Sequence, residues 1–174
     1  MAHAVLRSAR LVLRPVSAAD RESLRAILAD PTVAAWWGTG SPDEAIDDVL
    51  AQPDFVTLVI DLDGTVAGAI LYAEEADPDY RHAGIDIFLG APFQGRGLGS
   101  EALRLLARYL FEERGHHRLT IDPAAGNERA IRTYAAAGFR PVGVMRRYER
   151  GRDGTFHDGL LMDLLADELR EPAP

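Results

Sequence analysis

The sequence predicts a single α+β domain over residues 1–174, with a mixed, mostly antiparallel central sheet of about seven strands flanked by about four helices. A length of 174 residues suits one domain of ordinary size, and 47% hydrophobic residues are enough to build one core. Short runs of strand character alternate with segments whose apolar residues recur at helical spacing. No internal repeat and no linker interrupts this order.

The N-terminal part of the chain is expected to hold one strand and two helices. Residues 10–16 alternate charged and apolar side chains, as a half-buried strand does. Ser17, with Asp20 three positions later, is typical of a helix start, and Asp30-Pro31 predicts the end of that helix. Ser41-Pro42 predicts a second helix, because proline suits the first helical position.

Three further strands are expected in the middle of the chain. Residues 55–61 and 65–72 flank an Asp63-Gly64 turn, and such a turn is typical of a β-hairpin. An acidic segment at residues 74–79 follows, and then a strand over residues 84–89. The hairpin connection is the reason to expect a mostly antiparallel sheet.

The C-terminal half alternates helices with strands. Apolar residues from Leu98 to Tyr109 line one face of a helix that ends near Gly115. A second helix over residues 127–137 ends at Gly138, since glycine commonly closes a helix. The remaining strands are expected at residues 118–122, 139–144 and 156–165, the last two separated by a turn at residues 151–154.

Composition excludes several classes of function. The chain has 27 acidic residues against 19 basic ones, a formal charge of −8, whereas proteins that bind nucleic acid are usually basic. All the basic residues are arginine, which excludes a lysine Schiff base and a Walker-type phosphate loop. The lack of cysteine excludes disulfides and thiolate nucleophiles. We therefore expect a cationic small molecule as partner and no nucleic acid.

No targeting or metal-binding pattern is recognised in the sequence. The N-terminal residues lack the apolar run of a signal peptide, and no stretch approaches 18 apolar residues, so we expect a cytoplasmic protein without membrane contact. His116-His117 has no third ligand at a suitable spacing, and no metal is expected. We expect a monomer or a homodimer.

The strongest functional signal is a glycine-rich loop, Gln94-Gly95-Arg96-Gly97-Leu98-Gly99, between a strand and an amphipathic helix. Glycines let the backbone approach a ligand closely, and the first amides of the helix are free to bind a phosphate. A tight turn without a ligand is the alternative. The spacing G-R-G-L-G does not fit the Rossmann fingerprint, which requires G-x-G-x-x-G.

This loop resembles the Q-x-x-G-x-G motif of the GNAT superfamily of acyl-CoA-dependent N-acyltransferases. Two more segments resemble the same family: the R-L-x-L-R-P opening at residues 10–15 and the N-x-x-A-x-x-x-Y-x-x-x-G-F pattern at residues 127–139. The three agree in order and spacing over almost the whole chain. The resemblance implies the GNAT fold, acetyl-CoA as acyl donor, and transfer to an amine.

The resemblance also implies how the cofactor is held. The strand at residues 87–89 should separate from its neighbour and pair with the pantetheine arm, while backbone amides of residues 95–100 hold the pyrophosphate. Asn127 corresponds to a polar residue near the pantetheine, or serves only as a helix N-cap. The implied cofactor-binding residues are Phe88, Leu89, Gln94, Gly95, Arg96, Gly97, Leu98, Gly99, Ser100 and Asn127.

Tyr134 corresponds to a tyrosine that donates a proton to the departing CoA thiolate in many family members. A phenol with an ordinary pKa near 10 is suited to protonating a thiolate. The alternative is a tyrosine that packs its helix on the sheet.

Further segments resemble the aminoglycoside 6′-N-acetyltransferases, among them Gly84-Ile85-Asp86 and Thr120-Ile121-Asp122-Pro123. In that subfamily the aspartate matching Asp86 contacts the amine and is the proposed general base. Since aminoglycosides are polycations, their pocket needs several carboxylates. The substrate-binding candidates are Trp36, Trp37, Glu74, Asp77, Asp122 and Asp153.

Other interpretations remain open at this point. Asp86 could close a sheet edge, the acidic residues near Glu74 could be solvated, and Trp36-Trp37 could belong to the core or a lid. The opening motif and the segment 158–162 also resemble acetyltransferases of protein N-termini and ribosomal proteins. A siderophore-lysine acyltransferase and a non-catalytic acyl-CoA-binding protein are the remaining alternatives.

Overall fold

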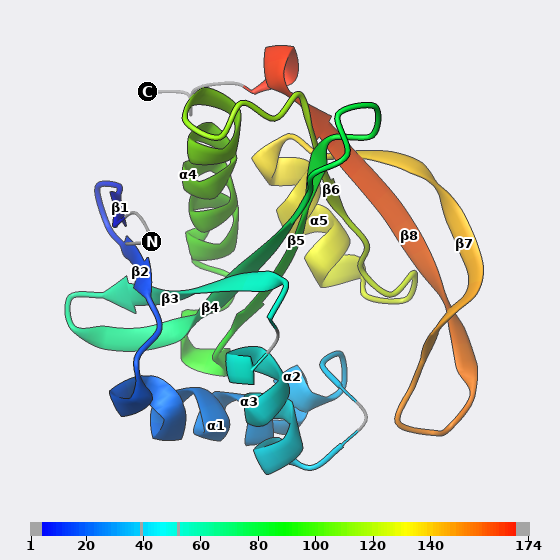
Figure 1. Cartoon of the computed structure of the whole chain (residues 1–174). Helices are drawn as coiled ribbons and strands as arrows, with labels where there is room; N and C mark the ends of the chain where they lie inside the picture. The colour runs from blue at the N-terminus through cyan, green and yellow to red at the C-terminus, as the bar shows by residue number, and fades with distance from the viewer. Residues whose placement is uncertain (1–4, 39, 52, 170–174) are drawn as a thin grey trace.

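A computed structural model describes residues 5–38, 40–51 and 53–169, and its eight strands form one sheet of order β1-β2-β3-β4-β5-β6-β8-β7 (Figure 1). All neighbouring strands are antiparallel except β5 and β6, which are parallel. The strands are β1 (Leu6–Arg7), β2 (Val12–Pro15), β3 (Phe55–Leu62), β4 (Thr65–Glu75), β5 (His82–Leu89), β6 (Arg118–Ile121), β7 (Arg140–Arg150) and β8 (Phe156–Leu165).

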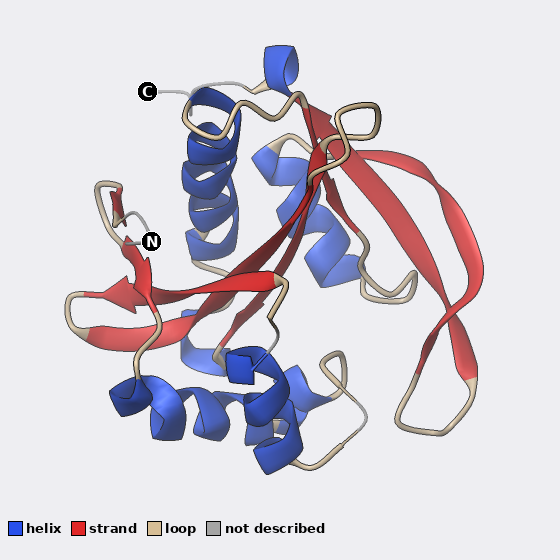
Figure 2. Ribbon diagram, in the orientation of Figure 1, coloured by secondary structure: helices blue, strands red, loops and turns tan. Residues whose placement is uncertain are grey.

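Helices cover both faces of this sheet (Figure 2). They are α1 (Arg21–Ala29), α2 (Pro31–Ala34), α3 (Pro42–Ala51), α4 (Leu98–Glu112) and α5 (Glu128–Ala137), with 3₁₀ turns η1 (Ala18–Asp20), η2 (Ala91–Phe93) and η3 (Ala166–Glu168). The predicted α+β class and mostly antiparallel sheet are confirmed. Within the described residues no helix is long and apolar enough to span a membrane.

The structure has one strand and one helix more than expected. β1 has only two residues, too few for any periodicity to show in the sequence. The helix that ends at Asp30-Pro31 is followed at once by α2, because the Asp30 side chain accepts a hydrogen bond from the Thr32 amide (2.8 Å) while Pro31 takes the first helical position. The same dipeptide therefore ends one helix and begins the next.

Two hydrophobic clusters pack on opposite faces of the sheet, since successive side chains of a strand point to opposite sides. In β4, Ile70 and Tyr72 face a cluster that includes the buried face of α4 and part of α5. Ala69 and Leu71 face the other cluster, with residues of α1, α2 and α3. The sheet is thereby fixed between the two groups of helices.

The sheet opens in its middle, between β5 and β6. These strands pair only through Ala83 with Leu119 and Gly84 with Thr120. Beyond Gly84, β5 continues for five residues on its pairing with β4 alone, and its other edge is unpaired in the described structure. The sequence-based expectation that the strand at residues 87–89 separates from its neighbour agrees with this register.

The β7–β8 hairpin projects beyond the rest of the sheet (Figure 1). Its pairing is irregular between Met145 and Glu149, where Arg147 has a φ of 53° and donates its amide hydrogen to Asp158 (2.8 Å). At the hairpin tip, Arg152 donates hydrogen bonds to the carbonyl oxygens of Ala34 (2.6 Å) and Gly40 (3.2 Å). The tip is thus held against the segment that follows α2.

A buried cluster of charges ties the N-terminal elements together. Arg14 on β2 donates two hydrogen bonds to Asp20 (2.8 and 2.9 Å) and one to Asp61 on β3 (2.8 Å). Asp20 also accepts hydrogen bonds from the amide and hydroxyl of Ser17. The Arg14 hydrogen bonds hold the pKa of Asp20 at about 2.

We predict that Asp20→Asn lowers the free energy of unfolding by about 1–3 kcal/mol, because the partly buried Arg14 guanidinium loses a charged, buried partner. Urea denaturation at pH 7 measures the loss. The Asp20 carboxylate stabilises the fold at pH values above the ordinary aspartate pKa, and this stabilisation is lost as the pH falls toward 2. The difference in unfolding free energy between wild type and variant should therefore shrink on acidification.

Asp47→Asn is the matched control, since the Arg21–Asp47 pair is exposed and should be worth little. Equal losses in the two variants, or a loss for Asp20→Asn that does not change with pH, would contradict this assignment.

Candidate active site

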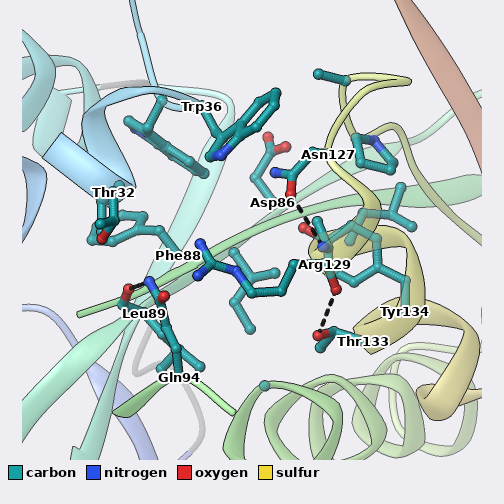
Figure 3. Close-up of a pocket in the computed structure, with 18 of the residues that line it drawn as sticks. Thr32, Trp36, Asp86, Phe88, Leu89, Gln94, Asn127, Arg129, Thr133 and Tyr134 are labelled. Carbon is teal, nitrogen blue, oxygen red and sulfur yellow. Dashed lines mark hydrogen bonds between the residues drawn. The ribbon is translucent and has the colours of Figure 1, made fainter. Parts of the chain in front are cut away.

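A cavity of about 610 Å³ lies at the opening between β5 and β6. Its walls come from β5, the β5–α4 loop and the start of α4, α5, the loop after β6, the segment around α2, α3 and Glu149 of β7 (Figure 3). Segments far apart in the sequence therefore meet at one place because the sheet is split there.

The glycine-rich loop forms one end of the cavity. Gly95 and Gly97 have φ angles of 72° and 73°, which favour glycine over residues with a Cβ. The Gln94 side chain donates a hydrogen bond to the Leu89 carbonyl (2.7 Å), tying the loop to the end of β5. The first amides of α4 have no partner within the helix, which leaves them available to an anion.

Most of the cofactor-binding candidates line the cavity, namely Phe88, Leu89, Gln94, Gly95, Gly97, Leu98, Gly99, Ser100 and Asn127. Arg96 is the exception: its carbonyl faces the Arg10 side chain, and it is not among the lining residues. Asn127 caps α5 by accepting a hydrogen bond from the Ala130 amide (3.2 Å), so the capping role is present at a residue that also lines the cavity.

Tyr134 lies on α5 and is 8% exposed, at the wall of the cavity. Burial, together with the charges of Asp86 and Asp122, raises its pKa well above the usual range. The hydroxyl is consequently protonated throughout the physiological range and is able to donate a proton to a group bound beside it.

Three carboxylates meet at the other side of the cavity: Asp86 on β5, Asp122 after β6 and Glu149 on β7. Burial and the charges of Asp122 and Glu149 raise the pKa of Asp86 to about 6, and burial and Asp122 raise the pKa of Glu149. None of the three forms an ion pair with another described residue. This grouping favours a cationic ligand.

Tyr148 adds a polar group beside these carboxylates. A hydrogen bond to Asp122, together with burial, raises the pKa of Tyr148 to about 12. Its ring packs so closely over Gly159 that a Cβ at that position would lie 2.9 Å from the ring. The ring is thus supported by β8 while its hydroxyl reaches Asp122.

The two tryptophans have different positions. Trp37 packs against Phe88, with ring centroids 4.7 Å apart, and belongs to the core cluster under α1 and α3. Trp36 is 44% exposed and stands over the cavity above Asp86 (Figure 3). Both tryptophans line the cavity, and Trp36 has the more exposed ring.

Three substrate-binding candidates lie outside the cavity lining. Glu74 is on β4 rather than in an acidic loop, and it pairs with Arg114 and His116 (2.8 Å each). Asp77 caps a turn by accepting the Asp79 amide hydrogen (2.9 Å). Asp153 accepts hydrogen bonds from Thr155 and is paired with His157 at the hairpin tip, so it too is engaged locally.

Sequence reasoning missed four charged lining residues, namely Asp48, Arg129, Arg132 and Glu149. Glu149 lies in the consecutive polar run R-R-Y-E-R at residues 146–150 of β7, and the irregular pairing between Met145 and Glu149 decides which way it faces. Arg129 lies two residues after Asn127, and its side chain extends toward the middle of the cavity (Figure 3). Its position in the first turn of α5, near Asn127, was the only feature of the sequence that could have indicated a place in the site.

The cavity thus has two chemical ends. The glycine-rich loop, the helix amides and Arg129 suit a phosphorylated ligand, whereas the three carboxylates and Trp36 suit a cation. Tyr134 lies on the wall between them. Among the described residues, no group of three His, Asp or Glu side chains is arranged to hold a metal ion.

Residues 10–140 match the acetyltransferase (GNAT) domain. The chain is 30% identical over 133 residues to the aminoglycoside N(6′)-acetyltransferase type 1 of Klebsiella pneumoniae, and 30% identical over 121 residues to YdaF of Bacillus subtilis, which carries a provisional name as a ribosomal N-acetyltransferase. These matches cover 65% of this chain in both cases, and 65% and 63% of the relatives' own length.

A solved structure of AAC(6′)-Ib in complex with paromomycin and acetyl-CoA is similar over 94% of this chain and 99% of that chain, with a TM-score of 0.75 and 26% identity.

We predict that Asp86 titrates near pH 6 and that Asp122→Asn lowers its pKa, because one of the nearby negative charges is removed. NMR titration of the aspartate side-chain carboxyl carbons measures both values. Asp79→Asn, in the exposed loop, is the control and should leave Asp86 unchanged. An Asp86 pKa near the ordinary value, or one insensitive to Asp122→Asn, would disprove the coupling.

Proposed function

The chain belongs to the GNAT acetyltransferase family, and on this premise we propose that it transfers an acetyl group from acetyl-CoA to the 6′-amine of an aminoglycoside. The observation that carries the acceptor class is that Asp86, Asp122 and Glu149 meet in the cavity and form no ion pair with another described residue. Such a site attracts a molecule with several ammonium groups. The identity to an aminoglycoside N(6′)-acetyltransferase supports the same acceptor.

The residues at the other end fit acetyl-CoA. Left-handed glycines at positions 95 and 97 expose backbone amides to a pyrophosphate, and the unpaired edge of β5 offers hydrogen-bonding groups to the amides of a pantetheine arm. Arg129 supplies positive charge nearby. Acetyl-CoA supplies the activated thioester.

The polar side chains of the cavity then act on the acceptor amine and on the departing sulfur. Asp86, ionised above about pH 6, accepts a proton from the substrate ammonium, so that the amine nitrogen carries a free lone pair. That nitrogen forms the new bond to the acetyl carbon while the carbon–sulfur bond breaks. The Tyr134 hydroxyl donates its proton to the departing sulfur and is reprotonated by the second proton that the nitrogen loses. Asp122 and Glu149 hold other ammonium groups of the acceptor.

A protein acceptor is the second candidate. The chain is 30% identical to YdaF, whose provisional name is ribosomal N-acetyltransferase, and equally 30% identical to the aminoglycoside N(6′)-acetyltransferase. Sequence identity therefore supports a protein acceptor and an aminoglycoside acceptor equally. A peptide N-terminus carries one ammonium group, whereas an aminoglycoside carries several. The three carboxylates therefore favour the aminoglycoside.

We predict that Tyr134→Phe lowers kcat by about 10²–10⁴-fold while binding of acetyl-CoA, measured by calorimetry, stays the same. The ring keeps its packing and only the hydroxyl is lost. Thiol release under conditions in which chemistry is rate-limiting measures the effect. A decrease of less than about threefold would assign Tyr134 to packing alone.

We predict that Asp86→Asn lowers kcat as well as raising KM for kanamycin, because it removes both the attraction and the proton acceptor. Asp122→Asn should mainly raise KM, as expected for a contact made equally before and during reaction. In the wild type, kcat/KM should fall as the pH drops below about 6. Acetylation of N-terminal peptides but not of kanamycin would replace this proposal by the protein acceptor.

A further inference from the structure

The R-L-x-L-R-P opening contains two arginines, and only Arg14 has a structural role so far. Leu11 and Leu13 between them are buried, at 2% and 0% exposed, and hold the strand in the core. Arg10 is half exposed and lies beside the glycine-rich loop, 86 residues away in the sequence. The proposed transfer reaction does not use it.

Arg10 joins the loop to the first turn of α4. Its Nη1 donates a hydrogen bond to the Arg96 carbonyl (3.0 Å), and its Nε donates to Glu101 Oε2 (2.7 Å). Ser8 donates to the other oxygen of Glu101 (2.7 Å). Although burial opposes ionisation of Glu101, the hydrogen bonds from Ser8 and Arg10 keep its pKa below the usual value, so its charge persists and anchors the guanidinium.

The direction of one peptide group follows from this contact. In a trans peptide the carbonyl and the next amide hydrogen point to opposite sides, and the described residues contain no cis peptide. With the Arg96 carbonyl held toward Arg10, the Gly97 amide hydrogen points the other way. Gly97 lines the cavity, whereas Arg10 and Arg96 do not.

We propose that Arg10 is a positioning residue for the binding of acetyl-CoA. Arg10 holds the Arg96 carbonyl on the side away from the cavity and thereby orients the Gly97 amide toward the pyrophosphate. The inference rests on the proposed binding of acetyl-CoA at this loop. The Arg96–Gly97 peptide is followed by a left-handed glycine, whose backbone is more permissive than that of other residues, so an external contact on the Arg96 carbonyl helps to fix the peptide. Arg10 also neutralises Glu101, whose charge would otherwise repel a phosphate at the start of α4.

The test compares two ligands and three variants by calorimetry and kinetics. Arg10→Gln should raise the Kd for CoA by about three- to tenfold, the range expected for loss of one oriented hydrogen bond. The KM for acetylpantetheine, which has no pyrophosphate, should change less than twofold. Arg7→Gln is the control, since Arg7 is an exposed arginine on β1 and should leave both values unchanged.

Arg10→Lys separates positioning from simple charge. A lysine keeps the charge but cannot span Glu101 and the Arg96 carbonyl with a planar fork, so CoA binding should remain weakened. Full recovery of CoA affinity in Arg10→Lys, an unchanged Kd in Arg10→Gln, or equal losses for CoA and acetylpantetheine would each overturn the inference. A wild-type protein that fails to bind CoA would instead overturn the proposed function.

Discussion

The short parallel pairing of β5 with β6 determines where the sheet opens and therefore where the cavity lies. Two residue pairs join the strands, and beyond Gly84 the edge of β5 is unpaired. Unpaired backbone groups in the middle of a sheet require another partner, which a ligand with amide groups is able to supply. The core clusters on the two faces hold the remaining strands in place, so the opening is a fixed feature of the sheet.

The opening also explains the electrostatic division of the site. Because Gly84 pairs with Thr120, the residues two positions further on each strand, Asp86 and Asp122, face the same space. Their mutual repulsion and burial raise the pKa of Asp86 toward neutrality, where a carboxylate is able to exchange protons with an amine. The glycine-rich loop and the first amides of α4 lie at the other end of the cavity, and Arg129 extends toward its middle.

Much of this could be predicted from the sequence, because local patterns determine it. The Asp63-Gly64 hairpin, the glycine-rich loop and the helix containing Tyr134 lie where turn, helix and motif signals placed them. Glu149 was not predicted because an irregularity of strand pairing between Met145 and Glu149, which leaves no periodic signal in the sequence, decides its direction. Glu74 and Asp153 were predicted as substrate-binding from the resemblance and from their charge. In the structure Glu74 pairs with Arg114, 40 residues away in the sequence, and Asp153 pairs with the nearby His157.

We propose that the unpaired edge of β5 binds the pantetheine arm of acetyl-CoA. Amide hydrogen exchange with and without saturating CoA tests it most directly. We expect slower exchange in residues 86–89 and in the loop 95–100 when CoA is bound, with no change at the β7–β8 hairpin tip. Unchanged exchange in residues 86–89 while CoA is bound would show that the arm lies elsewhere.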